Sequence, residues 1–271
     1  MKDLNLLEGV EAAEGQFYER HLRSQALNKL KAARRGLILL LTLRDQIALN
    51  EQTGQPFDYV EQAYIELAAA VFVNARAAFI LTKTGYLIPA RILLRTLWEE
   101  VVFMEYFRLY PDESRAWALA ANRSAGRTPS PRSAWSAVKA KARDSVLGGK
   151  RGPVYDYLTR YAHTHRHALF ELTAASSDTK AATSFGPAYA ATNVDFTLEL
   201  MTSLLVSAIE VLERVFESRL RQTGAQPLTE ILGSILKLAL SDYSLNSSQH
   251  TKSVQKADDP EDKPETPAHA D

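Results

Sequence analysis

The chain has 271 residues, of which 46% are apolar and 24% charged, so it can bury a sizeable core and is not disordered throughout. Its 32 basic and 32 acidic residues balance, which excludes an overall electrostatic attraction to nucleic acid or to a membrane surface. The absence of cysteine excludes disulfides, thiolate metal sites and thiol catalysis, and it fits the reducing cytoplasm, where we expect the protein to reside.

Apolar residues recur at helical spacing along most of the chain, whereas sustained two-residue alternation is hard to find. This pattern predicts an all-α fold. We expect long helices over 11–52, 58–84, 88–109 and 194–222, and a short last helix over 227–240. Four long helices with short connections are typical of an antiparallel bundle.

Residues 114–172 are interrupted by glycines and prolines, which predicts shorter helices and partly irregular structure inserted into the bundle. The long apolar stretch 63–81 carries Glu66 and Arg76 near its middle, and these charges disfavour a membrane span. We therefore expect no spanning helix and no membrane partner.

From residue 241 the composition changes to small, polar and charged residues, with seven acidic and three basic side chains over 241–271. So few large apolar residues do not offset the entropy of ordering the chain. The sequence predicts a single helical-bundle domain over 1–240, followed by a disordered acidic tail.

Residues 115–167 have a surplus of positive charge. They contain eleven Lys and Arg residues but only two acidic residues, a net charge of +9. Such a segment can be a solvated loop face, because Lys and Arg often only keep irregular segments soluble. It can also be a surface for the RNA backbone, which makes RNA the predicted partner.

Three of the six histidines, His163, His165 and His167, fall within five residues of this basic segment. In a helix His163 and His167 share a face while His165 points away, so this run alone does not form a three-histidine site. No His-Glu-x-x-His or comparable zinc spacing is present. We therefore expect no metal ion and no cofactor.

Arg91, Arg95 and Glu99 form a charged stripe on the predicted helix 88–109, which is apolar over most of its circumference. Trp98 lies on the same arc, so the stripe is not an ordinary solvent face. Arg95 precedes Glu99, an order that supports an isolated helix less than the reverse. The pattern predicts a half-buried Arg95–Glu99 pair that holds another group in position. The alternative is a structural ion pair that joins two helices.

The segment Arg95-Thr-Leu-Trp-Glu99 resembles the Arg-Ser/Thr-Leu-x-Glu signature of a family of uncharacterised bacterial α-helical proteins, a domain of unknown function. Tyr155-Asp-Tyr-Leu-Thr-Arg-Tyr-Ala-His163 is similar to that family's second signature, Tyr-x-x-Leu-Ser-x-x-x-His. The resemblance covers residues 60–215 and implies that Arg95, Glu99, Tyr155 and His163 come together between helices. After His163 the chain departs from the family, because it adds charge where the family often has a small residue or proline.

The family's bundle is also similar to the HEPN class, many of whose members are metal-independent ribonucleases with an Arg-x(4–6)-His motif that acts across a dimer. Arg160 is followed by His165 after four residues and by His167 after six. The resemblance implies that a histidine serves as base toward a 2′-hydroxyl and that the arginine stabilises charge on the phosphate. It also implies a homo-oligomer, for which helices 58–84 and 194–222 hold an excess of apolar residues. The alternative is that these helices are central in a monomer and buried all round.

We therefore expect an HEPN-like helical bundle that cleaves or binds RNA without a metal ion. The alternative is a non-catalytic interaction or small-ligand-binding module in which the Arg-Glu-His cluster is structural. Kinase, dehydrogenase and hydrolase functions lose their usual support, because the sequence lacks their glycine-rich and Gly-x-Ser-x-Gly motifs. The candidate site residues are Arg95, Glu99, Tyr155, Arg160, His163, His165 and His167.

Overall fold

The structure is a computed structural model, and its described residues are helices with their caps and turns, without a strand. The predicted all-α class is confirmed on these residues. The predictions for the tail, 241–271, lie outside them. The described residues are 11–12, 14–19, 26–53, 56–120, 129–147, 154, 157–159, 191–222 and 228–240.

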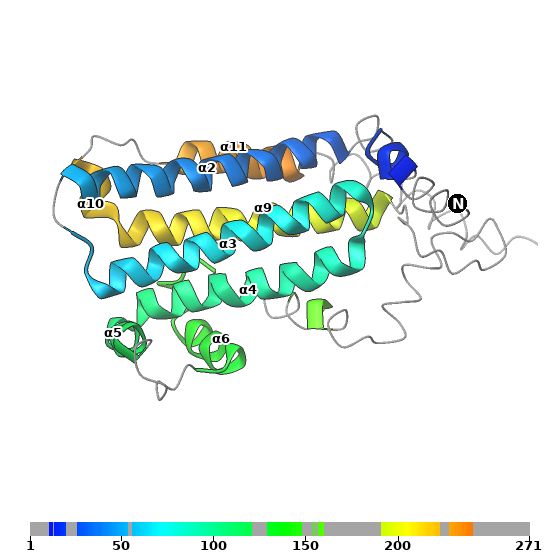
Figure 1. Ribbon diagram of the computed structural model, residues 1–271. Helices are drawn as coiled ribbons and strands as arrows, with labels where there is room; N and C mark the ends of the chain where they lie inside the picture. The colour runs from blue at the N-terminus through cyan, green and yellow to red at the C-terminus, as the bar shows by residue number, and fades with distance from the viewer. Residues whose placement is uncertain are drawn as a thin grey trace, which may run out of the picture. The chain divides into compact units, whose positions relative to one another are not determined.

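Four long helices run side by side and form the bundle (Figure 1). Consecutive helices α2, α3 and α4 reverse direction, and α9 packs against all three of them. The long helices are α2 (Ala26–Thr53), α3 (Tyr59–Thr84), α4 (Leu87–Leu109) and α9 (Ala191–Val215). The shorter helices are α5 (Pro111–Ala120), α6 (Pro131–Ala140), α10 (Glu217–Gln222) and α11 (Thr229–Leu240).

The ends of α3 follow from local chemistry. Asp58 Oδ1 accepts hydrogen bonds from the backbone N–H groups of Val60 and Glu61, both at 2.8 Å, and Glu61 Oε2 accepts one from the Asp58 N–H at 3.0 Å. This reciprocal capping satisfies N–H groups that the first turn leaves without partners. Gly85 ends α3 at φ 90°, a left-handed conformation that a residue without Cβ adopts at low cost.

Two of the predicted long helices are divided in the structure. In the predicted helix 11–52, the described helical residues 14–19 precede α2, and the residues between them lie outside the described part. In the predicted helix 194–222, a turn residue, Phe216, separates α9 from α10. The Phe216 ring is buried and meets the Phe57 ring edge-on at 6.0 Å, so both helices stay attached to the core.

Helix α9 is the centre of the bundle, because buried residues occur on all sides of it. A Cβ atom added at Gly36 of α2 would lie 3.2 Å from Leu205 Cδ1, so glycine permits a close approach of α2 to α9. The apolar excess of α9 is therefore used inside the chain. On α3, the exposed apolar residues Val73 and Ile80 remain available for the predicted self-association.

A buried ion-pair cluster joins α2 to α9. Lys29 Nζ lies 3.2 Å from Asp195 Oδ2 and 2.6 Å from Glu199 Oε1, and the Lys29 side chain is 5% exposed. Burial lowers the pKa of Lys29, but the Glu199 and Asp195 carboxylates more than offset this and raise it above its ordinary value. The lysine therefore stays charged, which fixes the two helices against each other.

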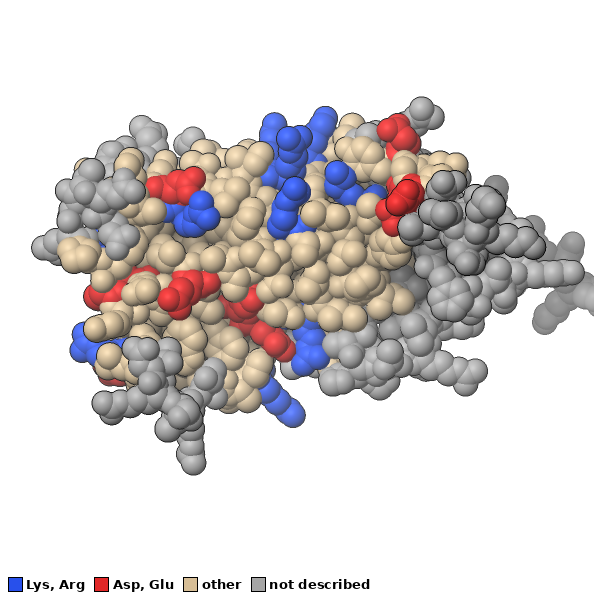
Figure 2. Space-filling view, viewed as in Figure 1, with Lys and Arg blue, Asp and Glu red and all other residues tan. Residues whose placement is uncertain are grey.

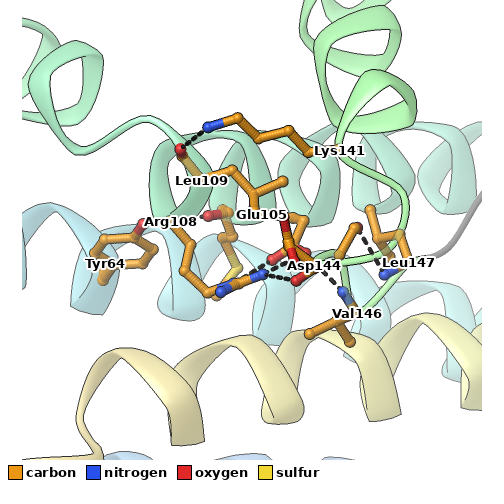
Figure 3. Close-up of polar contacts among 10 residues, drawn as sticks. Tyr64, Glu105, Arg108, Leu109, Lys141, Asp144, Val146 and Leu147 are labelled. Atoms are coloured by element: carbon orange, nitrogen blue, oxygen red, sulfur yellow. Dashed lines mark hydrogen bonds and ion pairs between the residues drawn. The ribbon is translucent and has the colours of Figure 1, made fainter.

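A second buried cluster holds the turn after α6 against α4 (Figure 3). Glu105 is fully buried; its Oε2 accepts from Arg108 Nε at 2.7 Å, and its Oε1 accepts from Arg108 Nη2 at 2.9 Å and from the Val146 N–H at 2.7 Å. Arg108 also donates to the Asp144 carbonyl, and Lys141 Nζ donates to the Leu109 carbonyl at 2.9 Å. These hydrogen bonds join α4 to the turn after α6, so the cluster has a structural role.

Candidate functional site

The predicted pair on α4 is present and half-buried. Arg95 Nε lies 3.2 Å from Glu99 Oε1, and the two side chains are 23% and 22% exposed. The pair joins residues of one helix, one turn apart, so the ion pair itself does not tie two helices together. Both groups stay within reach of solvent at the edge of the bundle.

The remaining predicted site residues, Tyr155, Arg160, His163, His165 and His167, lie outside the described residues. The convergence of Arg95, Glu99 and His163 therefore stays a prediction. Part of the second signature is described, however. Residues 157–159 are helical, and Leu158 is fully buried.

Arg91 connects α4 to this described part of the second signature. Its side chain is fully buried; Nε donates to Thr197 Oγ1 at 3.2 Å, and Nη2 donates to the Asn193 carbonyl at 3.2 Å and to Asn193 Oδ1 at 3.0 Å. The guanidinium also lies 5.4 Å from the centre of the Tyr157 ring and 6.0 Å from that of Phe196. Arg91 therefore joins α4, α9 and residues 157–159 at one point.

The sequence placed Arg91 on the charged stripe but did not separate its role from that of Arg95. One helical turn, about 5.4 Å along the axis, separates the two residues. The structure gives them different surroundings, since Arg91 is sealed and Arg95 reaches solvent. The Thr159 hydroxyl, at the Ser/Thr position of the second signature, is buried without a hydrogen-bond partner.

Beside the Arg95–Glu99 pair, α4 carries a carboxyl group that was not predicted. Glu100 Oε1 accepts a hydrogen bond from Asn74 Nδ2 of α3 at 2.7 Å, whereas Glu100 Oε2 is buried without a partner. Burial raises the pKa of Glu100 from 4.5 to about 7; the Asn74 bond opposes this, and the negative charge of Glu99 adds to it. The group therefore changes charge near neutral pH.

We expect the Glu100 carboxyl to reduce stability as the pH rises. Between pH 4.5 and 7 the folded protein keeps a proton that the unfolded chain has lost, so the free energy of unfolding falls with pH across this window and levels off above it. The neutral variant Glu100→Gln should lack this loss. The free energy of unfolding of Glu100→Gln, relative to that of wild type, should be about 1 kcal/mol higher at pH 8.5 than at pH 5. The difference is no larger because solvent at the half-buried group screens much of the pKa shift.

Urea unfolding of wild type and Glu100→Gln at pH 5 and pH 8.5 measures this difference. Glu66→Gln, on the exposed face of α3, is the matched control and should show the same pH dependence as wild type. An equal gap between wild type and Glu100→Gln at both pH values would contradict the prediction.

The basic segment 115–167 is described only in part. Arg115, Arg132, Lys139 and Arg143 are exposed, whereas Lys141 is half-buried and holds α6 to the end of α4. The exposed side chains are available to an anionic partner. They are equally consistent with a solvated face.

An open groove of about 750 Å³ between α2 and α3 was not predicted from the sequence. Basic side chains gather over these two helices in Figure 2. In the sequence, these basic residues are spaced along two helices, so each has the pattern of an ordinary solvent-facing charge. The lining residues are Tyr18, Leu27, Leu30, Lys31, Arg34, Leu37, Ile38, Leu41, Phe72, Arg76, Phe79 and Lys83.

Comparisons with protein-family models, with curated proteins and with solved structures found no match to this chain. Within the described residues there is no group of three His, Asp or Glu side chains that could hold a metal ion. All six histidines lie outside that part of the chain. In the same part, α3 alone is long and apolar enough to cross a membrane, a property that core helices of soluble bundles share.

Proposed function

We propose that the α4 stripe and the segment from Tyr155 to His167 form one RNA-directed site of the HEPN-like kind. The observation that supports this proposal most is the contact of Tyr157 with Arg91. It brings the start of the second signature to α4 one turn from Arg95. The Arg95–Glu99 pair, partly open to solvent, lies on the same stripe.

In this proposal the site cleaves RNA without a metal ion. The His163 imidazole takes the proton of a 2′-hydroxyl, the 2′-oxygen attacks the adjacent phosphorus, and the 5′-oxygen leaves. The products are a 2′,3′-cyclic phosphate and a 5′-hydroxyl end. Arg160 stabilises the charge that develops on the phosphate, and His165 or His167 protonates the leaving oxygen. Glu99 holds the Arg95 guanidinium in place.

The proposal predicts cleavage of total RNA by the purified full chain in the presence of a metal chelator. His163→Ala should slow cleavage roughly a hundredfold, because a positioned acid or base contributes about that much. His250→Ala, a histidine in the predicted tail, is the matched control and should cleave at the wild-type rate. Intact RNA with the wild-type protein, or equal rates for His163→Ala and wild type, would contradict ribonuclease activity.

The HEPN-like site also implies a dimer, which light scattering of the same samples measures. A dimer mass fits a site composed across a two-fold interface. A monomer of about 30.2 kDa at tens of micromolar would remove the composite site and leave the binding function described next.

The second candidate function is a non-catalytic binding module in which the α4 stripe holds the bundle together. The full burial of Arg91 and its bonds to α9 favour this alternative, because a sealed guanidinium does not reach a substrate. The RNA experiment separates the two, since a binding module leaves RNA intact.

A further inference from the structure

The groove between α2 and α3 combines positive charge with an apolar floor. Four basic side chains, Lys31, Arg34, Arg76 and Lys83, line it together with leucine, isoleucine and aromatic side chains, and no acidic residue occurs among its described lining residues. A cleft of this volume is in the range of small-molecule sites, which are mostly apolar with a few placed polar groups.

Among the described residues, the basic side chains of the groove have no acidic partner within ion-pair distance. No carboxylate of the described residues forms an ion pair with Lys31, Arg34 or Arg76, whereas Arg44, three turns beyond Arg34 on α2, pairs with Asp45 at 2.6 Å. Lys83 Nζ lies 4.2 Å over the Tyr18 ring. This concentration of unbalanced positive charge favours an anion.

The basic side chains of the groove lie among the apolar residues Leu27, Leu30 and Phe79, whereas its other end is lined by apolar residues alone. The basic residues occupy the end where Lys31 and Arg34 of α2 face Arg76 and Lys83 of α3. Beyond Arg34, the α2 residues that line the groove are Leu37, Ile38 and Leu41, with Phe72 of α3 opposite them. From Arg34 to Leu41 the helix advances about 10 Å, so the apolar end can cover a medium-length hydrocarbon chain.

At the apolar end of the groove, apolar side-chain surface is exposed to solvent in the free protein. Ile38, which lines this end of the groove, is 53% exposed. Covering such side chains with hydrocarbon is favourable, and the charged end fixes the direction of the ligand.

We propose that this groove binds one free molecule of a single-chain anionic amphiphile, such as a fatty acid. The carboxylate lies among Lys31, Arg34 and Arg76, and the chain lies over Leu37, Ile38 and Leu41. A second copy of the chain is a poorer occupant, because a two-fold interface here would place the same positive groups together. RNA would leave the apolar end uncovered. The proposal does not depend on the α4 site.

Isothermal titration calorimetry of the full chain with sodium decanoate, below its micelle concentration and at low salt, tests the proposal. We expect saturable binding of one decanoate per chain and no detectable binding of acetate, which lacks the chain. Dodecanoate should bind roughly fifteenfold more tightly than decanoate, because each buried methylene adds about fourfold. Decyltrimethylammonium, with the opposite charge, should bind at least tenfold more weakly than decanoate.

Two sets of variants locate the binding site. Arg34→Gln and Arg76→Gln should each weaken decanoate binding about tenfold, whereas the control Arg35→Gln, exposed on α2 but outside the groove, should bind within twofold of wild type. Ile38→Asp should also weaken binding about tenfold, and Leu49→Asp, equally exposed on α2 outside the groove, should not. These positions are exposed or line an open groove, and circular dichroism verifies that each variant is folded.

Three results would overturn the proposal. One is the absence of saturable decanoate binding to wild type. Another is an equal effect of Arg35→Gln and Arg34→Gln, which would show non-specific charge attraction. The third is co-sedimentation with phosphatidylglycerol vesicles without binding of monomeric decanoate, which would make the face a membrane contact.

Discussion

Replacing Glu105 by glutamine should lower the free energy of unfolding by about 3 kcal/mol, because the change leaves the half-buried charge of Arg108 without its carboxylate. Glutamine keeps the size of the side chain, so the loss reports charge and hydrogen bonding and not a cavity. Glu105 accepts from three donors in the folded protein, and two of them belong to Arg108. The third, the Val146 N–H, secures the turn after α6 (Figure 3).

Urea denaturation of Glu105→Gln and of Glu217→Gln measures this effect against a matched control. Glu217 pairs with Arg221 on α10, but the two side chains are 59% and 77% exposed, so Glu217→Gln should stay within about 0.5 kcal/mol of wild type. The double variant Glu105→Gln/Arg108→Met should lose less than the sum of the two single losses, since it leaves no charge behind. Equal stabilities of Glu105→Gln and Glu217→Gln would show that the buried pair contributes nothing.

The helices were predictable because their signals are local. Apolar spacing placed α3 and α4 to within a residue or two of their observed bounds. Packing also explains why the arc of α4 that carries the charged stripe includes the large apolar side chain of Trp98. Trp98 is 1% exposed and meets Trp135 of α6 edge-on at 5.4 Å, so the apolar part of the arc faces α6.

The sites were harder to predict because they depend on residues that meet only in the folded chain. Arg34 and Arg76 are far apart in sequence, and each has the pattern of a solvent-facing charge on an amphipathic helix. Only the antiparallel arrangement of α2 and α3 brings them to one groove. Likewise, a raised pKa at Glu100 requires burial against α3, which periodicity alone does not show.

Replacing Arg91 by methionine should have an effect at least as large as that at Glu105, about 3–5 kcal/mol. Methionine keeps an unbranched aliphatic stem at this position but lacks the guanidinium group. It removes the donors to Thr197 and Asn193, and each buried acceptor that loses its partner costs about 1–3 kcal/mol. It also removes the cation that lies against the Tyr157 ring.

A series of three arginines separates burial from charge in the Arg91 prediction. Arg91→Met should lower the free energy of unfolding the most. Arg95→Met should lower it by about 1 kcal/mol, because the Arg95 side chain is 23% exposed. Arg221→Met should stay within about 0.5 kcal/mol of wild type, because the Arg221 side chain is 77% exposed. In a double-mutant cycle, Arg91→Met and Tyr157→Leu should be coupled by at least 0.5 kcal/mol. If the two losses simply add, residues 157–159 are not held to α4 through Arg91, and the second signature loses its structural link to the Arg95–Glu99 pair.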